Sequence, residues 1–336
     1  MIVTRFAPAP TGYLHLGHVL NALHVWGIAR ALGGRVLLRV EDHDRQRSRP
    51  EFERAMLDDL DWLGFVPDDP PTAAFRAGAC QGRQSDRTEV YAQALTTLRN
   101  GADDGLSSTS PAPVAAGTSQ ASGIYACDCT RRDVREAMEQ ATGPVAPDTE
   151  LRYSGRCATR GLPWRRGLGL RVRIDDTIER FVDLRHGLQE QRPFEQCGDI
   201  LLKDRDDNWT YQFAATVDDM LQGVNLVVRG DDLLASTGRQ ILLARMLGRE
   251  EPPRFLHHGL IMKSATQKLS KADRDTSVGD MRAAGASADT VFGRALHAAG
   301  FTGAPTAIAR TEAEQVVAEH YRSALDDIRS AGRVHP

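Results

Sequence analysis

Residues 1–42, MIVTRFAPAPTGYLHLGHVLNALHVWGIARALGGRVLLRVED, decide the fold class of this chain. The first residues, MIVTRFAPA, predict a short strand that leaves its sheet at Pro8. Apolar residues at helical spacing follow in LGHVLNALHVWGIARALGG, where Gly33 and Gly34 predict the end of the helix. The run RVLLRVED predicts an apolar strand that ends in acids. A strand, a helix and a strand within about forty residues are typical of the βαβ unit of a parallel sheet, so we expect an α/β fold.

The α/β pattern continues along the chain with one interruption. Residues 50–65 and 84–100 predict amphipathic helices, and the pattern resumes at residues 194–248. Residues 101–123 are rich in Ser, Ala, Gly and Pro, which predicts a flexible loop without a core of its own. The predicted divisions are the first half of the parallel-sheet domain at 1–100, the loop at 101–123, a cysteine-containing insertion at 124–190, the second half of the sheet domain at 191–260, and a lysine-containing loop with a helical C-terminal region at 261–336.

The composition excludes several classes of protein. With 336 residues, 41% of them hydrophobic and 26% charged, the chain is typical of globular proteins of two or three domains. No run of eighteen apolar residues occurs, and Arg5 and nearby prolines interrupt the segment where a signal peptide would be apolar, so we expect a cytoplasmic protein without membrane contact. A net charge of -3 argues against nonspecific nucleic-acid binding, which phosphate neutralisation drives.

The tetrad HLGH at residues 15–18 is the first candidate site. In the first turn of a helix, His15 and His18 would lie on one face at the N-terminus, where free backbone N–H groups and the helix dipole favour an anion such as phosphate. Gly17 leaves room for a flat base to approach the backbone. The alternative is a capped helix whose two histidines are solvated or satisfied in the core.

The second candidate site is QKLSKADRD, residues 267–275, which follows the last predicted strand. Lys268 and Lys271 bracket Leu-Ser in a polar loop. A mobile ammonium at Lys271 would reach the β- and γ-phosphates of a nucleotide as charge develops during attack at the α-phosphate. Taken alone, the segment is a solvated basic loop; together with HLGH it favours nucleotide chemistry.

The five cysteines predict a metal site rather than a disulfide framework, because their number is odd and three of them cluster. Cys127 and Cys129 suit two ligands on a tight turn, and Cys157 follows the turn YSGRC. These residues leave the fourth ligand open, with Asp128 or a water as physical candidates. The alternative is three buried thiols, and we interpret Cys80 and Cys197 as plain thiols.

Around these cysteines the chain is basic. No acid occurs between Leu151 and Ile174, and this interval contains Arg152, Arg156, Arg160, Arg165, Arg166, Arg171 and Arg173. Such a run usually forms a solvated face, but next to a catalytic insertion a contact with RNA phosphates is an equal alternative.

Together these motifs resemble the class I aminoacyl-tRNA synthetases, whose signatures are HIGH and KMSKS. Here they read HLGH and KLSKA, with Ala272 in place of the usual final serine. The segments RFAPAPTGYLHLGH, RVEDHDRQRS, VVRGDDLL and KLSK resemble the glutamyl branch, and CDC followed by YSGRC resembles its truncated members, the glutamyl-queuosine tRNA(Asp) synthetases. The resemblance covers residues 1–100 and 124–275 and implies a Rossmann-like parallel sheet, a zinc-containing insertion and a short helical C-terminal region.

The resemblance also implies a glutamate pocket. A zwitterion with an extra carboxylate needs a fixed guanidinium, an acid for its ammonium and polar groups that orient it. In a doubly wound sheet the candidate residues lie at or just beyond strand ends, where such folds bind ligands, although surface salt bridges are the alternative for any one of them. The residues so implied are Arg5, Phe6, Ala7, Pro8, Ala9, Glu41, Tyr211 and Arg229.

Further roles follow from the same resemblance. The implied catalytic residues are His15, His18, Lys268 and Lys271, and the implied ATP-binding residues are His15, Gly17, His18 and Lys271. The implied ligands of one structural zinc ion per chain are Cys127, Cys129, Tyr153 and Cys157. Mg²⁺ would accompany ATP.

The resemblance therefore implies ATP-dependent activation of L-glutamate and transfer to queuosine in the anticodon loop of tRNA(Asp), by a monomer. A conventional glutamyl-tRNA synthetase also needs an anticodon-binding domain, for which the 65 residues after Lys271 are too few. Two alternatives stay open: conventional glutamylation of tRNA(Glu), and a catalytically inert paralogue that only binds RNA.

Overall fold

The computed structural model describes residues 1–100, 123–146, 149–262 and 276–331. Its first hundred residues contain β1 (Val3–Phe6), α1 (Leu16–Ala31), β2 (Arg35–Leu38), α2 (Pro50–Leu63), α3 (Thr72–Ala77), the 3₁₀ helix η1 (Gln84–Arg87) and α4 (Thr88–Asn100). β1 and β2 pair in parallel from Val3–Arg35 to Phe6–Leu38, so the predicted βαβ unit is confirmed. α2 begins at Pro50 and ends before Gly64, whose φ of 74° lies in the left-handed region.

The second half of the sheet comes from residues 179–258. Its elements are β5 (Glu179–Asp183), β6 (Gly187–Gln191), α6 (Pro193–Cys197), α7 (Tyr211–Leu221), β8 (Leu226–Gly230), η2 (Asp231–Ser236), α8 (Thr237–Met246) and β9 (Arg254–His258). The strand order is β6-β5-β9-β8, in which β9 pairs in parallel with both neighbours. β8 also lies beside β1, because Asn225 N donates to Val3 O at 3.0 Å. β1 and β8 are therefore neighbours, and the two halves of the sheet meet along them.

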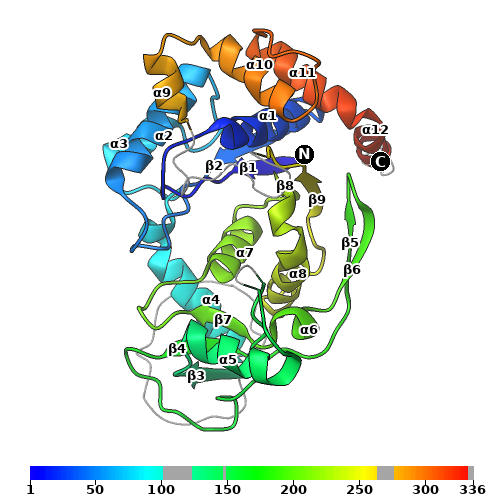
Figure 1. The fold of residues 1–336 in the computed structure, drawn as a ribbon. Coiled ribbons are helices and arrows are strands. Elements are labelled where there is room, and N and C mark those ends of the chain that lie inside the picture. Colours follow the sequence, from blue (N-terminus) through cyan, green and yellow to red (C-terminus); the bar gives the residue numbers. More distant parts are fainter. Residues whose placement is uncertain (101–122, 147–148, 263–275, 332–336) are drawn as a thin grey trace.

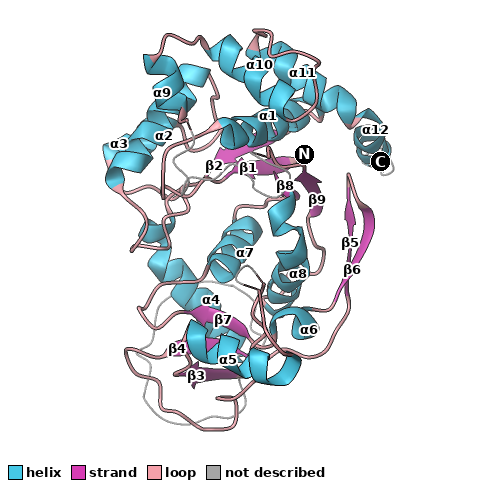
Figure 2. Cartoon of the chain, viewed as in Figure 1, coloured by secondary structure: helices cyan, strands magenta, loops and turns pink. Residues whose placement is uncertain are grey.

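Residues 276–331 form the helices α9 (Val278–Ala283), α10 (Ala288–Ala298), α11 (Arg310–His320) and α12 (Arg322–Ala331). α1 lies between these helices and the sheet, which explains why it is apolar on nearly all sides (Figure 1). A Cβ at Gly27 would lie 2.6 Å from Glu314 O, so glycine permits the close approach of α1 and α11. α8 covers the other face, where Ile241 packs with Phe181 and Phe255 (Figure 2).

A smaller antiparallel sheet has the order β3-β4-β7, formed by β3 (Ile124–Cys127), β4 (Gly169–Val172) and β7 (Ile200–Lys203), beside α5 (Arg131–Thr142). Strand pairing crosses the predicted boundary at residue 190: β5 pairs with β9, whereas β7 pairs with β4. The boundaries derived from the sequence remain proposals. The predicted loop at 101–123 lies, except for Gly123, outside the described residues, as does the KLSK segment. Within the described ranges, no helix is long and apolar enough to span a membrane.

Candidate active site

The structure brings together the four charged or polar residues predicted for the glutamate pocket. Arg5 lies in β1, Glu41 follows β2, Tyr211 begins α7, and Arg229 lies in β8. Both arginines and Glu41 are buried, and Tyr211 is partly buried. Burial and the nearby Glu41 carboxylate raise the pKa of Tyr211, so its hydroxyl stays protonated at neutral pH.

Arg39, just beyond β2, is completely buried and contacts three carboxylates. It donates to Glu41 Oε1 from Nη2 at 3.0 Å and to Asp219 Oδ1 from Nη1 at 2.7 Å, and Asp218 Oδ2 lies 3.7 Å from its Nε. Arg5 Nε donates to the same Asp219 Oδ1 at 3.0 Å. Burial alone would raise the pKa of Asp219, but the two guanidinium groups outweigh it and lower this pKa to about 2. Asp219 is therefore ionised and holds both arginines.

Asp218 extends this network to the segment that precedes and begins α4. Its carboxylate accepts hydrogen bonds from Gln84 Nε2 at 2.8 Å, Arg87 Nε at 2.7 Å and Tyr91 Oη at 2.9 Å. Asp218 is completely buried, and these contacts satisfy a carboxylate that would otherwise be costly to bury. The network fixes α7, and with it Tyr211, against the first half of the sheet.

Arg229 has different surroundings. Its guanidinium donates to His257 Nε2 at 2.9 Å, Gln240 Oε1 at 2.7 Å and Thr237 Oγ1 at 2.9 Å. Burial lowers the pKa of Arg229, and the Tyr211 hydroxyl opposes this effect by stabilising the charged form. Among the described residues, no carboxylate forms an ion pair with Arg229. A buried guanidinium in this state favours binding of an anion.

The short segment Phe6 to Ala9 connects β1 to the loop before α1. The Phe6 ring packs against Trp26 in the core with centroids 5.4 Å apart, and its carbonyl accepts from Arg39 N at 3.0 Å. The Pro8 carbonyl accepts from Glu41 N at 3.1 Å. The Phe6 ring is thus committed to the core, while Ala7 and Ala9 are partly exposed.

His15 and His18 cap the N-terminus of α1 reciprocally. His15 Nδ1 accepts from Gly17 N at 3.1 Å, and His18 Nδ1 accepts from His15 N at 3.2 Å. A backbone N–H can only donate, so a neutral ring in this arrangement carries its hydrogen on Nε2. The two rings lie 4.0 Å apart. The motif therefore orients two Nε2–H groups at a helix N-terminus, where anions are stabilised.

The packing of the His15 ring gives a second reason for glycine at position 17. A Cβ at this position would lie 3.0 Å from His15 Cε1 and 3.1 Å from His15 Nδ1, so glycine lets the ring fold over the helix end. Lys268 and Lys271, predicted to complete the phosphate site, lie outside the described residues.

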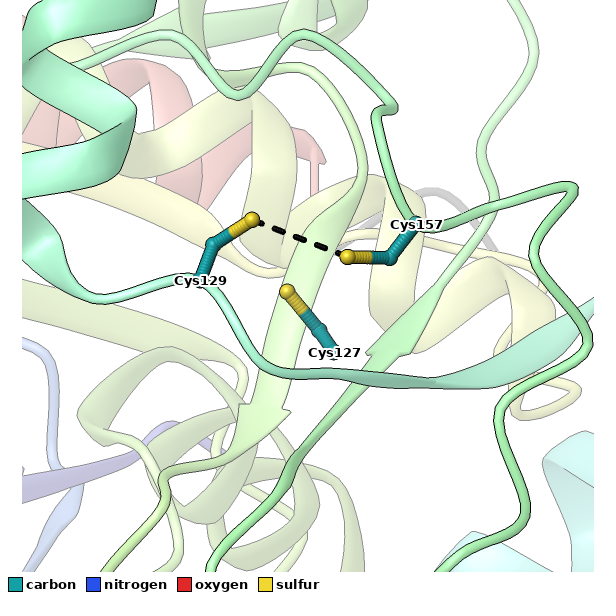
Figure 3. Close-up of side chains that lie close together, drawn as sticks. All are labelled: Cys127, Cys129 and Cys157. Carbon is teal, nitrogen blue, oxygen red and sulfur yellow. Dashed lines mark hydrogen bonds between the residues drawn. The ribbon is translucent and has the colours of Figure 1, made fainter.

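The predicted cysteine cluster is present (Figure 3). The sulfurs of Cys127, Cys129 and Cys157 all lie within 4.8 Å of one another and can hold a metal ion. The Sγ atoms of Cys129 and Cys157 are 3.6 Å apart, close to the separation of about 3.8 Å that two Zn–S bonds of about 2.3 Å give at a tetrahedral angle. Tyr153 Oη lies 3.5 Å from Cys127 Sγ, whereas Asp128 Oδ1 lies 3.3 Å from Cys157 Sγ.

The basic stretch around this cluster divides into two groups. Arg171 is buried, with its guanidinium over the Tyr153 ring at 3.7 Å, and Arg152 donates to Phe194 O at 3.0 Å. Arg171 therefore does not belong to the basic face expected from the sequence, whether solvated or in contact with RNA, and Arg152 is only partly exposed. The exposed members are Arg156, Arg160, Arg165, Arg166 and Arg173, and among them Trp164 is 54% exposed.

Comparison with known proteins identifies the family. The family model for the catalytic domain of class I tRNA synthetases (E and Q) matches residues 1–102 and 120–320. The chain belongs to this family. It is similar to the glutamyl-Q tRNA(Asp) synthetase of Rhodobacter capsulatus, with 37% identity over 301 residues that cover 85% of this chain and 96% of that protein. For the Symbiobacterium thermophilum protein of the same name, identity is 37% over 315 residues, covering 91% and 88%.

Solved structures agree with this result. A glutamate tRNA ligase from Elizabethkingia meningosepticum, in complex with its amino acid, superposes with a TM-score of 0.69 at 25% identity. The match covers 94% of this chain and 64% of the ligase chain. This class I synthetase is accordingly an aminoacyl-tRNA ligase, and the predicted α/β fold with parallel sheet elements is confirmed.

Sequence reasoning about this synthetase missed the acids that hold its pocket arginines. A signal was present: Arg39 stands in the apolar run RVLLRV, and Asp218 and Asp219 stand in the apolar helix segment FAATVDDML. Charged residues in segments predicted to be buried require partners. The pattern alone does not say which charges pair, because Arg39 and Asp219 are 180 residues apart.

We predict that Asp219→Asn lowers the free energy of unfolding of the synthetase by about 3 kcal/mol at pH 7, since two buried guanidinium groups lose their shared carboxylate. The folded-state pKa of Asp219 lies below its unfolded value, so its contribution is complete above about pH 4 and is lost as pH falls through 2. The difference between wild type and variant should shrink by about 1 kcal/mol between pH 7 and pH 3 in urea unfolding.

The matched control is Asp326→Asn, because Asp326 forms an exposed ion pair with Arg329. This change should cost less than about 1 kcal/mol. Equal effects of the two substitutions, or a difference independent of pH, would contradict the proposed importance of the buried carboxylate.

Proposed function

We propose that this synthetase activates L-glutamate with ATP and transfers the glutamyl group to queuosine in the anticodon loop of tRNA(Asp). The observation that carries the proposal is the buried Arg229, which has no ion-pair partner among the described residues and faces a tyrosine hydroxyl. The names of the relatives from Rhodobacter capsulatus and Symbiobacterium thermophilum support the choice of amino acid and acceptor.

In this proposal the pocket recognises both the negative and the positive groups of glutamate. A carboxylate of the substrate accepts from Arg229 and Tyr211 and so compensates the buried cation. Arg5 adds a second guanidinium, which Asp219 holds through Nε. The substrate ammonium binds Glu41, of which Arg39 uses only Oε1. Phe6, Ala7, Pro8 and Ala9 shape the wall, with the Phe6 ring acting from the core side.

The activation step needs no protein nucleophile. An oxygen of the glutamate α-carboxylate forms a bond to the α-phosphorus of ATP, the bond from that phosphorus to the bridging oxygen breaks, and pyrophosphate leaves. His15 and His18 donate from Nε2 to phosphate oxygens, and the helix N-terminus adds its partial positive charge. Gly17 lets the nucleotide approach, and Lys268 and Lys271 bind the β- and γ-phosphates. Mg²⁺, when bound with ATP, neutralises phosphate charge.

In the transfer step, a hydroxyl oxygen of the modified base attacks the glutamyl carbonyl carbon. The bond to AMP breaks, AMP departs, and the hydroxyl proton is released. An anticodon-loop base is already unpaired, so turning it into a pocket costs little. The exposed arginines around the cysteine cluster bind loop phosphates in this proposal.

We further propose that the cysteine cluster holds one structural zinc ion with Tyr153 as its fourth ligand. Tyr153 is 3% exposed and its Oη accepts from Cys157 N at 2.8 Å, so the hydroxyl is fixed beside the sulfurs. Asp128 is the weaker candidate because Arg160 already binds its Oδ1 at 2.7 Å. Burial raises the pKa of Tyr153, so its phenol would lose the proton only on binding to the zinc ion.

The first prediction from this function is that the purified protein exchanges pyrophosphate into ATP with L-glutamate, without tRNA. L-glutamine should support little exchange, because its neutral amide leaves a buried guanidinium uncompensated. The measurement is exchange of labelled pyrophosphate as a function of amino-acid concentration. Exchange that is faster with glutamine than with glutamate would overturn the assignment.

The second prediction concerns the acceptor. Labelled glutamate should be transferred to queuosine-containing tRNA(Asp), but not to unmodified tRNA(Asp) or tRNA(Glu). The double variant Arg165→Glu/Arg166→Glu should weaken transfer and reduce its salt dependence while pyrophosphate exchange is retained.

The control for this experiment is the double variant Arg294→Glu/Arg322→Glu, which changes net charge equally on the C-terminal helices. It should leave transfer near wild type. Label on tRNA(Glu), released as an ordinary 3′-ester, would show that conventional glutamylation is the function.

The third prediction is that the protein binds one zinc ion per chain. Cys127→Ser and Cys157→Ser should lose the metal and lower the thermal midpoint, whereas Cys80→Ser, a buried thiol outside the cluster, should retain it. Tyr153→Phe should weaken zinc binding more than Asp128→Asn. Metal analysis and thermal unfolding before and after chelation provide the readout. Protein that is equally stable without metal would remove this site from the account.

A further inference from the structure

A buried chain of hydrogen bonds leads from Asp183 through His257 to Arg229. Asp183 ends β5, His257 lies in β9 and Arg229 in β8, so three neighbouring strands contribute one residue each. His257 Nδ1 lies 2.7 Å from Asp183 Oδ2, and Arg229 Nε lies 2.9 Å from His257 Nε2. Asp183 and His257 are at most 1% exposed, and Arg229 is 4% exposed.

The chemistry of these groups fixes the direction of each hydrogen bond. A guanidinium has no acceptor, so Arg229 donates and His257 Nε2 accepts. The hydrogen of a neutral His257 ring is then on Nδ1, which donates to Asp183. Burial lowers the pKa of His257, in agreement with the neutral form.

The far end of the chain is fixed by backbone groups. Asp183 Oδ1 accepts from the backbone N–H groups of Arg185 and His186, both at 2.9 Å, and Oδ2 also accepts from His257 N at 3.0 Å. These contacts hold the carboxylate in one orientation. Gln240 and Thr237 then hold the other side of the Arg229 guanidinium.

We propose that Asp183 and neutral His257 are positioning residues that hold the Arg229 guanidinium in the orientation that binds the substrate carboxylate. The inference rests on the glutamate pocket proposed above, and neither residue touches the substrate. His257 supplies an acceptor without a negative charge at Nε of Arg229. Arg229 is thereby oriented while its positive charge remains available to the substrate. A carboxylate bound directly to Arg229 would instead compensate that charge.

The discriminating experiment compares His257→Gln with His257→Asn. The Gln amide oxygen can reach the position of Nε2 and accept from Arg229, whereas the shorter Asn amide can reach only the position of Nδ1 and retains the contact with Asp183. In glutamate-dependent pyrophosphate exchange, we expect His257→Asn to raise the KM for glutamate on the order of tenfold. We expect His257→Gln to restore most of this loss, with the KM for ATP and kcat changing little in both.

His24→Gln is the matched control, because His24 is also completely buried but bonds Leu20 O rather than Arg229. It should leave the KM for glutamate unchanged. Equal KM values in the Asn and Gln variants, or a loss that follows thermal stability rather than the identity of the amide, would overturn the proposal. Absence of glutamate-dependent exchange in the wild type would instead overturn the proposed function.

A pH profile provides a second readout. Protonation of His257 would place an N–H against Arg229 Nε, so the wild-type KM for glutamate should rise several-fold as pH falls from 7.5 to 5. Charged or titratable groups around His257 are Asp183, Arg185, Arg229, Asp231 and His258. His186 lies on the turn between β5 and β6 and bonds Asp231 at 2.8 Å.

All these groups remain in His257→Gln. If the KM for glutamate in this variant no longer rises at low pH, the rise in the wild type is due to protonation of His257. A profile that keeps the wild-type slope would contradict the role of the neutral ring.

Discussion

The buried charge of Arg39 is the constraint on which the rest of the site depends. A guanidinium that is completely removed from water is tolerated only when acceptors surround it, and here Glu41, Asp218 and Asp219 supply them. Two of these acids lie on α7 and one follows β2, so satisfying one cation fixes a helix against a strand from the other half of the sheet. The shared oxygen of Asp219 then extends the same constraint to Arg5.

This arrangement gives the pocket two kinds of arginine. Arg5 is paired with an acid and so is held without an excess of charge, whereas Arg229 is held by an imidazole, an amide and a hydroxyl. The two environments differ because Arg5 in β1 contacts Asp219 of α7, whereas Arg229 in β8 contacts residues of α8 and of the paired strand β9. An incoming carboxylate therefore gains most from contact with Arg229. In the proposed function, the distribution of neutral and charged partners, rather than the number of arginines, accounts for a preference for an anionic side chain.

The parts of this structure that could be predicted from sequence are those encoded locally. The βαβ unit follows from apolar periodicity in the first 42 residues, and the three clustered cysteines follow from their spacing. The partners of Arg39 and Arg229 could not be predicted this way, since Asp219 and His257 reach them only through tertiary pairing of distant strands and helices. Arg171 shows the same limit: it belongs to a basic stretch in the sequence but packs its guanidinium over Tyr153 in the fold. The local sequence pattern identifies a charged residue, but only the tertiary structure determines whether that charge is compensated within the protein or remains available to bind a ligand.

Three histidines of the site share one physical rule, which connects the pocket to the helix N-terminus. His15 and His18 each face a backbone N–H through Nδ1, and His257 faces a guanidinium through Nε2, so in every case an obligate donor determines which ring nitrogen accepts. The rule places a hydrogen on Nε2 of His15 and His18, which the proposed function directs to phosphate, and on Nδ1 of His257, toward Asp183. Because the donors are part of the backbone or permanently charged, the tautomers are set before any substrate binds. Preorganised donors of this kind avoid reorganisation during the reaction, and the same fold that buries Arg39 provides them.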